Sequence, residues 1–333
     1  YRATGEHYVA LAEDLPVPEP GPSFYDYVDA TAERFARGRP ERAAHWVALP
    51  IDETPIAPFG PRAGATTHVE RLPVAIDPRS EAALAEPYRT LSRQLSLIGV
   101  LASALAVVLH RLDGRRTFTF GVPLHHRSGP VAPRVIGPLM ELYPLTVEMG
   151  DDETFAELFA RVQRSLLDTM RQAKPGESPD VPYVGVLNVL TAQFGDFAGL
   201  PTVTDWWRSG HVDPAHPIRL HAYDYGDGLR AEVDLNDGLS GDGSHQGLTQ
   251  HLEAVVSAMC ADPQSKVSAV GLADAGDLAW LAALNPSPGR SARTEPVHET
   301  IQTQLRSRPD SVVAECGGIE MSAGELDARA DAL

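Results

Sequence analysis

The sequence predicts an α/β fold, a two-layer α/β sandwich in which helices flank a mixed β-sheet. Segments with the 3.6-residue period of a helix alternate with extended apolar segments along most of the chain. Residues 96–114 are apolar nearly all round, which indicates a helix buried against other structure. Such alternation of helices and strands is typical of layered α/β proteins.

Composition narrows the class of protein. The chain has 333 residues, enough for two or three domains or one large domain with appendages, and 43% of them are apolar. The net charge of −17 argues against nucleic-acid binding, because no basic face is available to replace phosphate counterions. No apolar run approaches the roughly 20 residues of a membrane span, so we expect no membrane association. Cys260 and Cys316 support neither a disulfide framework nor a zinc site, which fits a cytoplasmic protein.

The first 60 residues predict three short helices interrupted by prolines. Residues 1–15 have the pattern of the end of a helix, which the prolines of "PVPEPGPS" terminate. Ser23 is a candidate N-cap for the amphipathic helix that follows, and residues 39–49 form another short helix. A loop rich in Pro and Gly at residues 50–64 indicates a sub-domain boundary.

The middle of the chain predicts the sheet and its principal helices. Asp77 is a candidate N-cap with Pro78 at the first helical position, and Gly114 ends the buried helix. Asp227 and Gly228 form the expected turn of a hairpin. The expected strands are residues 66–76, 116–124, 136–149, 181–192 and the two arms of 218–238, and the expected helices are residues 77–91, 96–114, 154–173 and 244–263.

Common catalytic and binding motifs do not match. The chain has no phosphate-binding G-x-x-x-x-G-K-S/T loop, and "GLSGD" at 238–242 has Asp242 where a hydrolase elbow needs its second glycine. His211, His216 and His221 are five residues apart, but the intervening prolines exclude the helix that would align them on a metal. We expect these histidines to face solvent or a backbone carbonyl, and we expect no metal site.

The stretch "GVPLHHRSGP" contains the one adjacent histidine pair of the sequence, His125 and His126. A histidine base needs a carboxylate or carbonyl to hold its tautomer, and no acid stands at a short fixed distance along the chain. The pair is therefore interpreted as two incidental polar residues in a loop. Arg127 is more informative, because an arginine just beyond a buried strand is well placed for a bidentate ion pair with a carboxylate from a distant part of the fold.

Several segments, taken in order, resemble the condensation domains of nonribosomal peptide synthetases, in the chloramphenicol-acetyltransferase-like superfamily. "SFYDYVDATAERF" is similar to the family's "sYxDYaxW", and "SLIGVLASALAVVLHRLDGRRTFTFGVPLHHR" is similar to its long buried helix followed by "GxPxxxR". "IGPLMELYPLTV" resembles "IGxFMNxxPLR", and "LRAEVDLNDGLSG" resembles the late strand and latch region. The tail "HETIQTQLRSRPDSVVAECGGIEMSAGELDARADAL" resembles the opening of an adenylation domain, with "MSAGEL" at the place of "LTYxEL".

The resemblance implies a fold of the chloramphenicol-acetyltransferase-like type and an amide-forming function. In this family the downstream amine attacks the upstream thioester, both tethered to carrier proteins by phosphopantetheine arms; no cofactor is bound directly. The partners implied are peptidyl or acyl carrier domains and the adjacent adenylation domain. The family signature HHxxxDG, whose second histidine acts as base or positions the amine, is not found in this chain, and "LHRLDG" has Leu109 where that histidine must be. We expect the signature in a missing N-terminal lobe that precedes Tyr1.

The resemblance also assigns site residues. Arg127 would brace the Asp of the signature, and no catalytic residue is expected in this chain. Asn188 would line the central channel, or else be a buried strand Asn bonded to backbone. Asn236 is a weaker channel candidate, because Asn before Asp-Gly is often turn chemistry. Glu141 stands where the family often has a channel-lining Asn, and Thr146 stands where it often has Arg.

The expected domains follow from the same comparison. Residues 1–60 would end the N-terminal lobe of a condensation domain, and 61–272 would form its C-terminal lobe. Residues 273–296 would be a linker, and 297–333 the truncated beginning of an adenylation domain, too short to bury a core of its own. Two alternatives stay open: a non-catalytic platform that docks a carrier protein or tailoring enzyme, and a free-standing acyltransferase.

Overall fold

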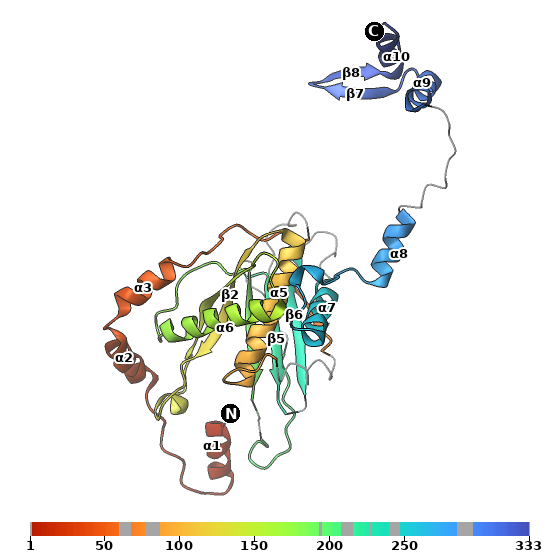
Figure 1. Ribbon diagram of the computed structural model, residues 1–333. Helices are drawn as coiled ribbons and strands as arrows, with labels where there is room; N and C mark the ends of the chain where they lie inside the picture. Colours follow the sequence, from red (N-terminus) through yellow and green to blue (C-terminus); the bar gives the residue numbers. More distant parts are fainter. Residues whose placement is uncertain are drawn as a thin grey trace. The chain divides into compact units, whose positions relative to one another are not determined.

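The computed structural model describes residues 2–59, 68–76, 87–192, 195–207, 216–226, 228–239, 247–284 and 296–332 (Figure 1). Two compact units divide the chain, residues 1–272 and 273–333, and each is described by itself. The lobe boundary expected near residue 60 and the N-cap expected at Asp77 lie outside the described residues. In the first unit the helices are α1 (Arg2–Ala12), α2 (Phe24–Phe35), α3 (Arg39–Val47), α5 (Arg93–Asp113), α6 (Phe155–Gln172) and α7 (Leu248–Ala261).

A six-stranded mixed sheet forms one layer of the first unit. Its order is β1-β6-β5-β4-β2-β3. The pairs β2–β4 and β4–β5 are parallel and the other neighbours are antiparallel. The predicted mixed sheet with flanking helices is therefore confirmed. The strands are β1 (Val69–Val74), β2 (Thr117–His125), β3 (Met140–Glu148), β4 (Gly185–Thr191), β5 (Ile218–Asp224) and β6 (Leu229–Asn236).

The helices α5, α6 and α7 form the second layer (Figure 1). They share one apolar core with the inward side chains of the strands, such as Phe118, Leu187 and Leu220. Because side chains alternate across a strand, the residues between these, such as Asn188 and His221, face the other side of the sheet. Several polar side chains of the central strands are thus gathered on the face away from the three helices.

The predicted buried helix is α5, which begins and ends as its sequence indicates. The Ser92 hydroxyl accepts from the Leu95 amide, and Gly114 closes the helix with a φ of +74°. At Gly99 the helix crosses α6 so closely that an added Cβ would lie 2.7 Å from the Phe159 ring. α5 is long and apolar enough to cross a bilayer by length and composition, but 72% of its most apolar stretch is buried inside the unit. It is the central core helix.

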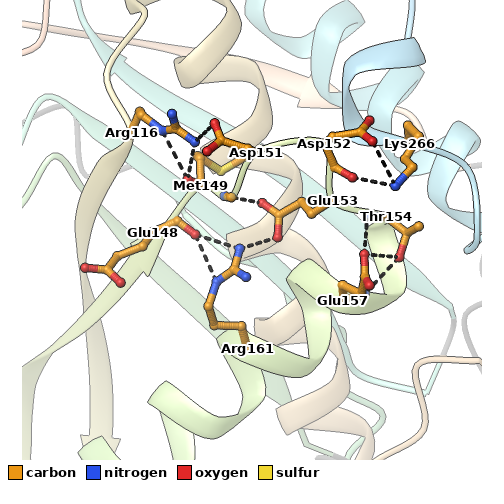
Figure 2. A network of polar contacts seen from close by, with 11 residues as sticks. Arg116, Glu148, Met149, Asp151, Asp152, Glu153, Thr154, Glu157, Arg161 and Lys266 are labelled. Carbon is orange, nitrogen blue, oxygen red and sulfur yellow. Dashed lines mark hydrogen bonds and ion pairs between the residues drawn. The ribbon is translucent and has the colours of Figure 1, made fainter.

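A polar network holds the turn between β3 and α6 (Figure 2). Glu153 is buried, accepts from the Gly150 amide at 2.6 Å, and pairs with Arg161. Arg161 also donates to the Glu148 carbonyl at 2.8 and 3.0 Å. At the helix end, Thr154 and Glu157 form a reciprocal capping box. These contacts fix where α6 enters the core.

The second unit is small and exposed. It contains α8 (Ala275–Leu284), α9 (Val297–Ser307), β7 (Val312–Cys316), β8 (Ile319–Ser322) and α10 (Ala323–Asp331), and β7 pairs antiparallel with β8. Within its described elements, Ala323 is the one residue that is buried. Residues 275–284, within the expected linker of residues 273–296, form a helix, because "AGDLAWLAAL" is rich in strong helix formers.

We expect Glu153→Ala to lower the free energy of unfolding of the first unit by about 2 kcal/mol, because the change removes a buried acceptor from both Arg161 and the Gly150 amide. Urea denaturation followed by circular dichroism measures it. Glu157→Ala, which removes only the exposed half of the capping box, is the matched control and should cost less. Equal losses in the two variants would contradict a special role for Glu153.

Candidate functional site

Arg127 lies in the loop that follows β2. Its guanidinium donates to the backbone carbonyls of Val135 at 2.7 Å and Gly137 at 2.9 Å. Within the described residues its side-chain hydrogen bonds go to backbone carbonyls, and no described carboxylate forms an ion pair with it. These hydrogen bonds connect Arg127, just before the loop of residues 128–137, to the end of that loop.

Next to it, His126 belongs to a partly buried hydrogen-bond cluster, in contrast to the incidental role expected from the sequence. Its Nε2 lies 3.2 Å from the hydroxyl of Tyr143, and its ring meets the Tyr143 ring edge-on at 5.6 Å. The Tyr143 hydroxyl donates to Glu141 Oε2 at 2.7 Å and also contacts the Lys174 carbonyl. An acid and a tyrosine therefore stand beside the histidine. They come from β3, which is close in space but 15 and 17 residues further along the chain.

The loop of residues 174–178 completes this cluster. Glu141 Oε1 accepts from the Gly176 amide at 2.7 Å, so the carboxylate joins β3 to the loop. Glu177, one residue further, pairs bidentately with Arg42 of α3 at 2.6 and 2.7 Å. Helix α3 is thus tied to the loop that holds Glu141.

The surroundings of the cluster favour the neutral forms of His126, Tyr143 and Lys174. Burial lowers the pKa of His126, Glu141 acts in the opposite direction, and Lys174 and His125 lower the pKa further. Burial and the hydrogen bond to Glu141 raise the pKa of Tyr143 far above its usual range. Lys174 itself has a lowered pKa, because it is partly buried and lies near Arg42. At neutral pH His126 is therefore an uncharged imidazole.

The two histidines border a cavity of about 650 Å³. Its walls come from α2, the start of α5, the end of β2 with its loop, and the end of α6. The basic side chains on its lining are Arg34, His125, His126 and Lys174, and no carboxylate lines it among the described residues. A cavity of this size accommodates a small molecule or an amino-acid-sized group.

Asn188 lies in a second polar group, on the sheet face away from the helices. Its Nδ2 is 3.4 Å from Nδ1 of His221 on β5, and His221 Nε2 is 3.3 Å from Asp234 on β6. Asp234 in turn accepts two hydrogen bonds from Arg71 of β1, at 2.6 and 2.8 Å. Each of four adjacent strands contributes one member to this row, and among the described residues the carboxamide of Asn188 contacts a side chain.

Interactions with the charged carboxylate of Asp234 stabilise this row of side chains. Burial alone would raise the pKa of Asp234, but hydrogen bonds from Arg71 and His221 outweigh it and lower the pKa to about 2. Glu232 also contacts Arg71 at 3.0 Å, and the Trp206 ring packs on His221 at 5.3 Å. The expectation that His221 faces solvent or a backbone carbonyl is wrong, because His221 is buried and contacts a carboxylate.

The other candidates have local roles or lie elsewhere. Asn236 is fully buried and its carboxamide oxygen accepts from the Gly238 amide at 3.0 Å, which is the turn chemistry weighed for it. The ring of His216 lies 5.3 Å from that of Tyr183, and His211 is outside the described residues. Within the described ranges, no three His, Cys, Asp or Glu side chains are arranged to hold a metal ion.

Sequence reasoning missed the partners of the candidate residues. Glu141 and Tyr143 are two residues apart on β3 and so lie on the same face of the strand, which is a readable signal once β2 and β3 are paired. The register places Leu124 opposite Glu141, so the two residues after Leu124 lie near that acid. For Arg71 and Asp234 no local signal exists, because β1 and β6 are 163 residues apart at this pair.

The lowered pKa of Asp234 predicts how the stability of the fold changes as the solution becomes acidic. Because its folded pKa is below the unfolded value of about 4, its carboxylate stabilises the fold above pH 4, and this contribution, about 2 kcal/mol, is lost as the pH falls toward 2. Urea unfolding between pH 2 and pH 6 measures this dependence. In the Asp234→Asn variant the loss of unfolding free energy between pH 4 and pH 2 should disappear. Asp168→Asn, at an exposed pair with Arg171, is the control and should keep the wild-type slope. An unchanged slope in Asp234→Asn would contradict the assignment.

Three comparisons with known proteins point to the same group of proteins. The family model of the condensation domain matches residues 1–177. An isonitrile lipopeptide synthase of Streptomyces coeruleorubidus is 27% identical over 354 aligned positions, which cover 98% of this chain and 22% of that protein. The cyclosporin synthetase of Tolypocladium inflatum is 23% identical over 261 positions, covering 72% of this chain and 2% of that protein. The chain thus spans a small part of these relatives.

Solved structures with the same fold include the first condensation domain of the calcium-dependent antibiotic synthetase in complex with a substrate analogue. It has a TM-score of 0.61 and 22% identity, over 81% of this chain and 62% of that one. The X-domain in complex with OxyB from teicoplanin biosynthesis has a TM-score of 0.65 and 18% identity, over 81% of this chain and 65% of that one. With the family model matching more than half of its residues, this chain belongs to the condensation-domain family.

Proposed function

We propose that this chain contributes the C-terminal lobe of a condensation domain in a nonribosomal peptide synthetase. In the proposed reaction the nitrogen of a carrier-bound aminoacyl group attacks the carbonyl carbon of an upstream thioester. A C–N bond forms, the C–S bond breaks, and the freed thiol stays on the phosphopantetheine arm of the upstream carrier. The observation that carries the proposal is the family match over residues 1–177, which includes the "GVPLHHR" end of β2.

The proposed role of Arg127 is to brace the Asp of an HHxxxDG signature carried outside these residues. Backbone carbonyls hold the guanidinium in one place, which supports a bracing role, because a fixed donor loses less entropy when it pairs. The side chain is otherwise exposed, so another segment can approach it. Asn188 is proposed to line the channel, since its carboxamide is held by His221 and remains partly exposed.

The proposed partners are carrier domains on both sides and an adenylation domain that begins in the second unit. The alignment with the isonitrile lipopeptide synthase supports this continuation, since it covers 98% of the chain. The scarcity of buried residues in that unit's described elements is what the first part of a larger domain would have. Phosphopantetheine is proposed to enter with the carriers rather than be bound to this chain covalently.

Arg127→Ala tests the proposal in the full synthetase. We expect single-turnover amide formation between loaded carriers to fall at least tenfold, and the unfolding free energy of the domain to fall by about 1 kcal/mol, since the loop loses its hydrogen bonds. Product is measured by mass spectrometry of the carriers. Arg134→Ala, on the same loop, is the control and should retain activity. Wild-type amide formation by Arg127→Ala would contradict the bracing role, and no amide formation by the wild-type synthetase would contradict the function itself.

A further inference from the structure

Two cationic side chains meet at one wall of the cavity beside the end of β2, and no described carboxylate lines that cavity. Cζ of Arg34 lies 5.2 Å and Nζ of Lys174 lies 5.8 Å from the centre of the Phe35 ring. Glu177, whose charge acts on Lys174 through space, pairs with Arg42 instead. The wall therefore carries positive charge that has no ion-pair partner among the described residues.

Lys174 is held in place and still has a donor to offer. Its ammonium group donates to the carbonyls of Arg171 and Ala173 at the end of α6. An ammonium group has three N–H donors, so one of them remains for a ligand. Burial lowers the pKa of Lys174, and Arg42 lowers it further. The surroundings thus disfavour the charged form, and an anion within hydrogen-bond reach stabilises it.

The rest of the lining decides which anion suits the cavity. Apolar side chains line it at the start of α5, on β2 and on α6, namely Leu95, Ile98, Leu124 and Met170. A strongly hydrated ion gains little from such walls, whereas an apolar body gains by leaving water. An amine is disfavoured by the same two cations. The chemistry that fits a cavity of about 650 Å³ is a carboxylate joined to an apolar body.

We propose that this cavity binds a small organic carboxylate, with its charge at Arg34 and Lys174 and its apolar body against Leu124 and Met170. A guanidinium matches a planar carboxylate in geometry, and Lys174 supplies its remaining donor. Such a ligand carries neither an amine nor a thioester, so the inference goes beyond the proposed function and does not depend on it. Because Arg34 belongs to α2 and Lys174 follows α6, the bound carboxylate connects these two elements.

Methyl NMR on the full chain with ¹³C-methyl-labelled methionine locates the ligand. Met170 lines the cavity, whereas Met259 is fully buried in the core on α7 and serves as the internal reference. The signals that disappear in Met170→Leu and Met259→Leu assign the two methyl groups. We expect benzoate to shift the Met170 signal and to leave the Met259 signal in place. An unmoved Met170 signal, or equal movement of both, would overturn the proposal.

Matched probes test the chemistry of the ligand. Benzamide has the ring and nearly the shape of benzoate without its charge, so we expect it to bind about tenfold more weakly in titrations of the Met170 signal. Acetate has the charge without the ring and should also bind more weakly. Equal affinities for benzoate and benzamide contradict a role for the two cations. Tighter binding of inorganic phosphate than of benzoate assigns a phosphate site instead and contradicts the carboxylate class.

Arg34→Gln and Lys174→Met each remove one charge and keep most of the side chain's stem. We expect each variant to weaken benzoate binding about fivefold and to leave benzamide binding unchanged, which a merely structural effect does not produce. Arg164→Gln, at an exposed position of α6, is the control and should bind benzoate as the wild-type chain does. Wild-type affinity for benzoate in both folded variants would refute the site. Arg34 is itself exposed, so its replacement keeps the test valid if Lys174→Met disturbs the end of α6.

Discussion

Burial of α5 against one face of the sheet is the constraint that organises the first unit. Thirteen of its residues are buried, from Leu97 to Leu109, and α6 and α7 pack beside it on the same side. The inward side chains of the central strands are therefore apolar, and their polar neighbours point the other way. The row of Asn188, His221, Asp234 and Arg71 follows directly, because it is assembled from the outward positions of neighbouring strands.

The cluster around Tyr143 arises differently, at the edge of the sheet. β3 is an edge strand, and its outer side is covered by α3 and the loop after α6, with Trp46 against the tyrosine ring at 5.8 Å. A buried hydroxyl there needs partners on several sides. Glu141 supplies one, and it introduces a titratable group there, whereas an asparagine would be neutral.

Much of the fold could be predicted from the sequence. The caps at Ser23 and Gly114 are local signals, as is the apolar pattern of α5, and each is realised in the structure. The candidate site was harder to predict from the sequence, because its residue pairs are set by strand register rather than by spacing along the chain. His126 meets Tyr143 only after β2 and β3 pair, and Asp234 meets Arg71 only after β6 and β1 pair. Charge and residue type alone therefore ranked Arg127 first and passed over its neighbour.

The ion pair between Arg42 and Glu177 links helix α3 to the edge of the sheet. Glu177 is next to Gly176, whose amide holds Glu141, and the Ser178 hydroxyl contacts the Leu142 carbonyl. The loop of residues 174–178 is thus a short link with α3 at one end and the edge strand at the other. Any displacement of α3 that leaves the Arg42–Glu177 ion pair intact pulls on the acceptors of Tyr143, so the geometry around the imidazole is mechanically linked to the position of α3.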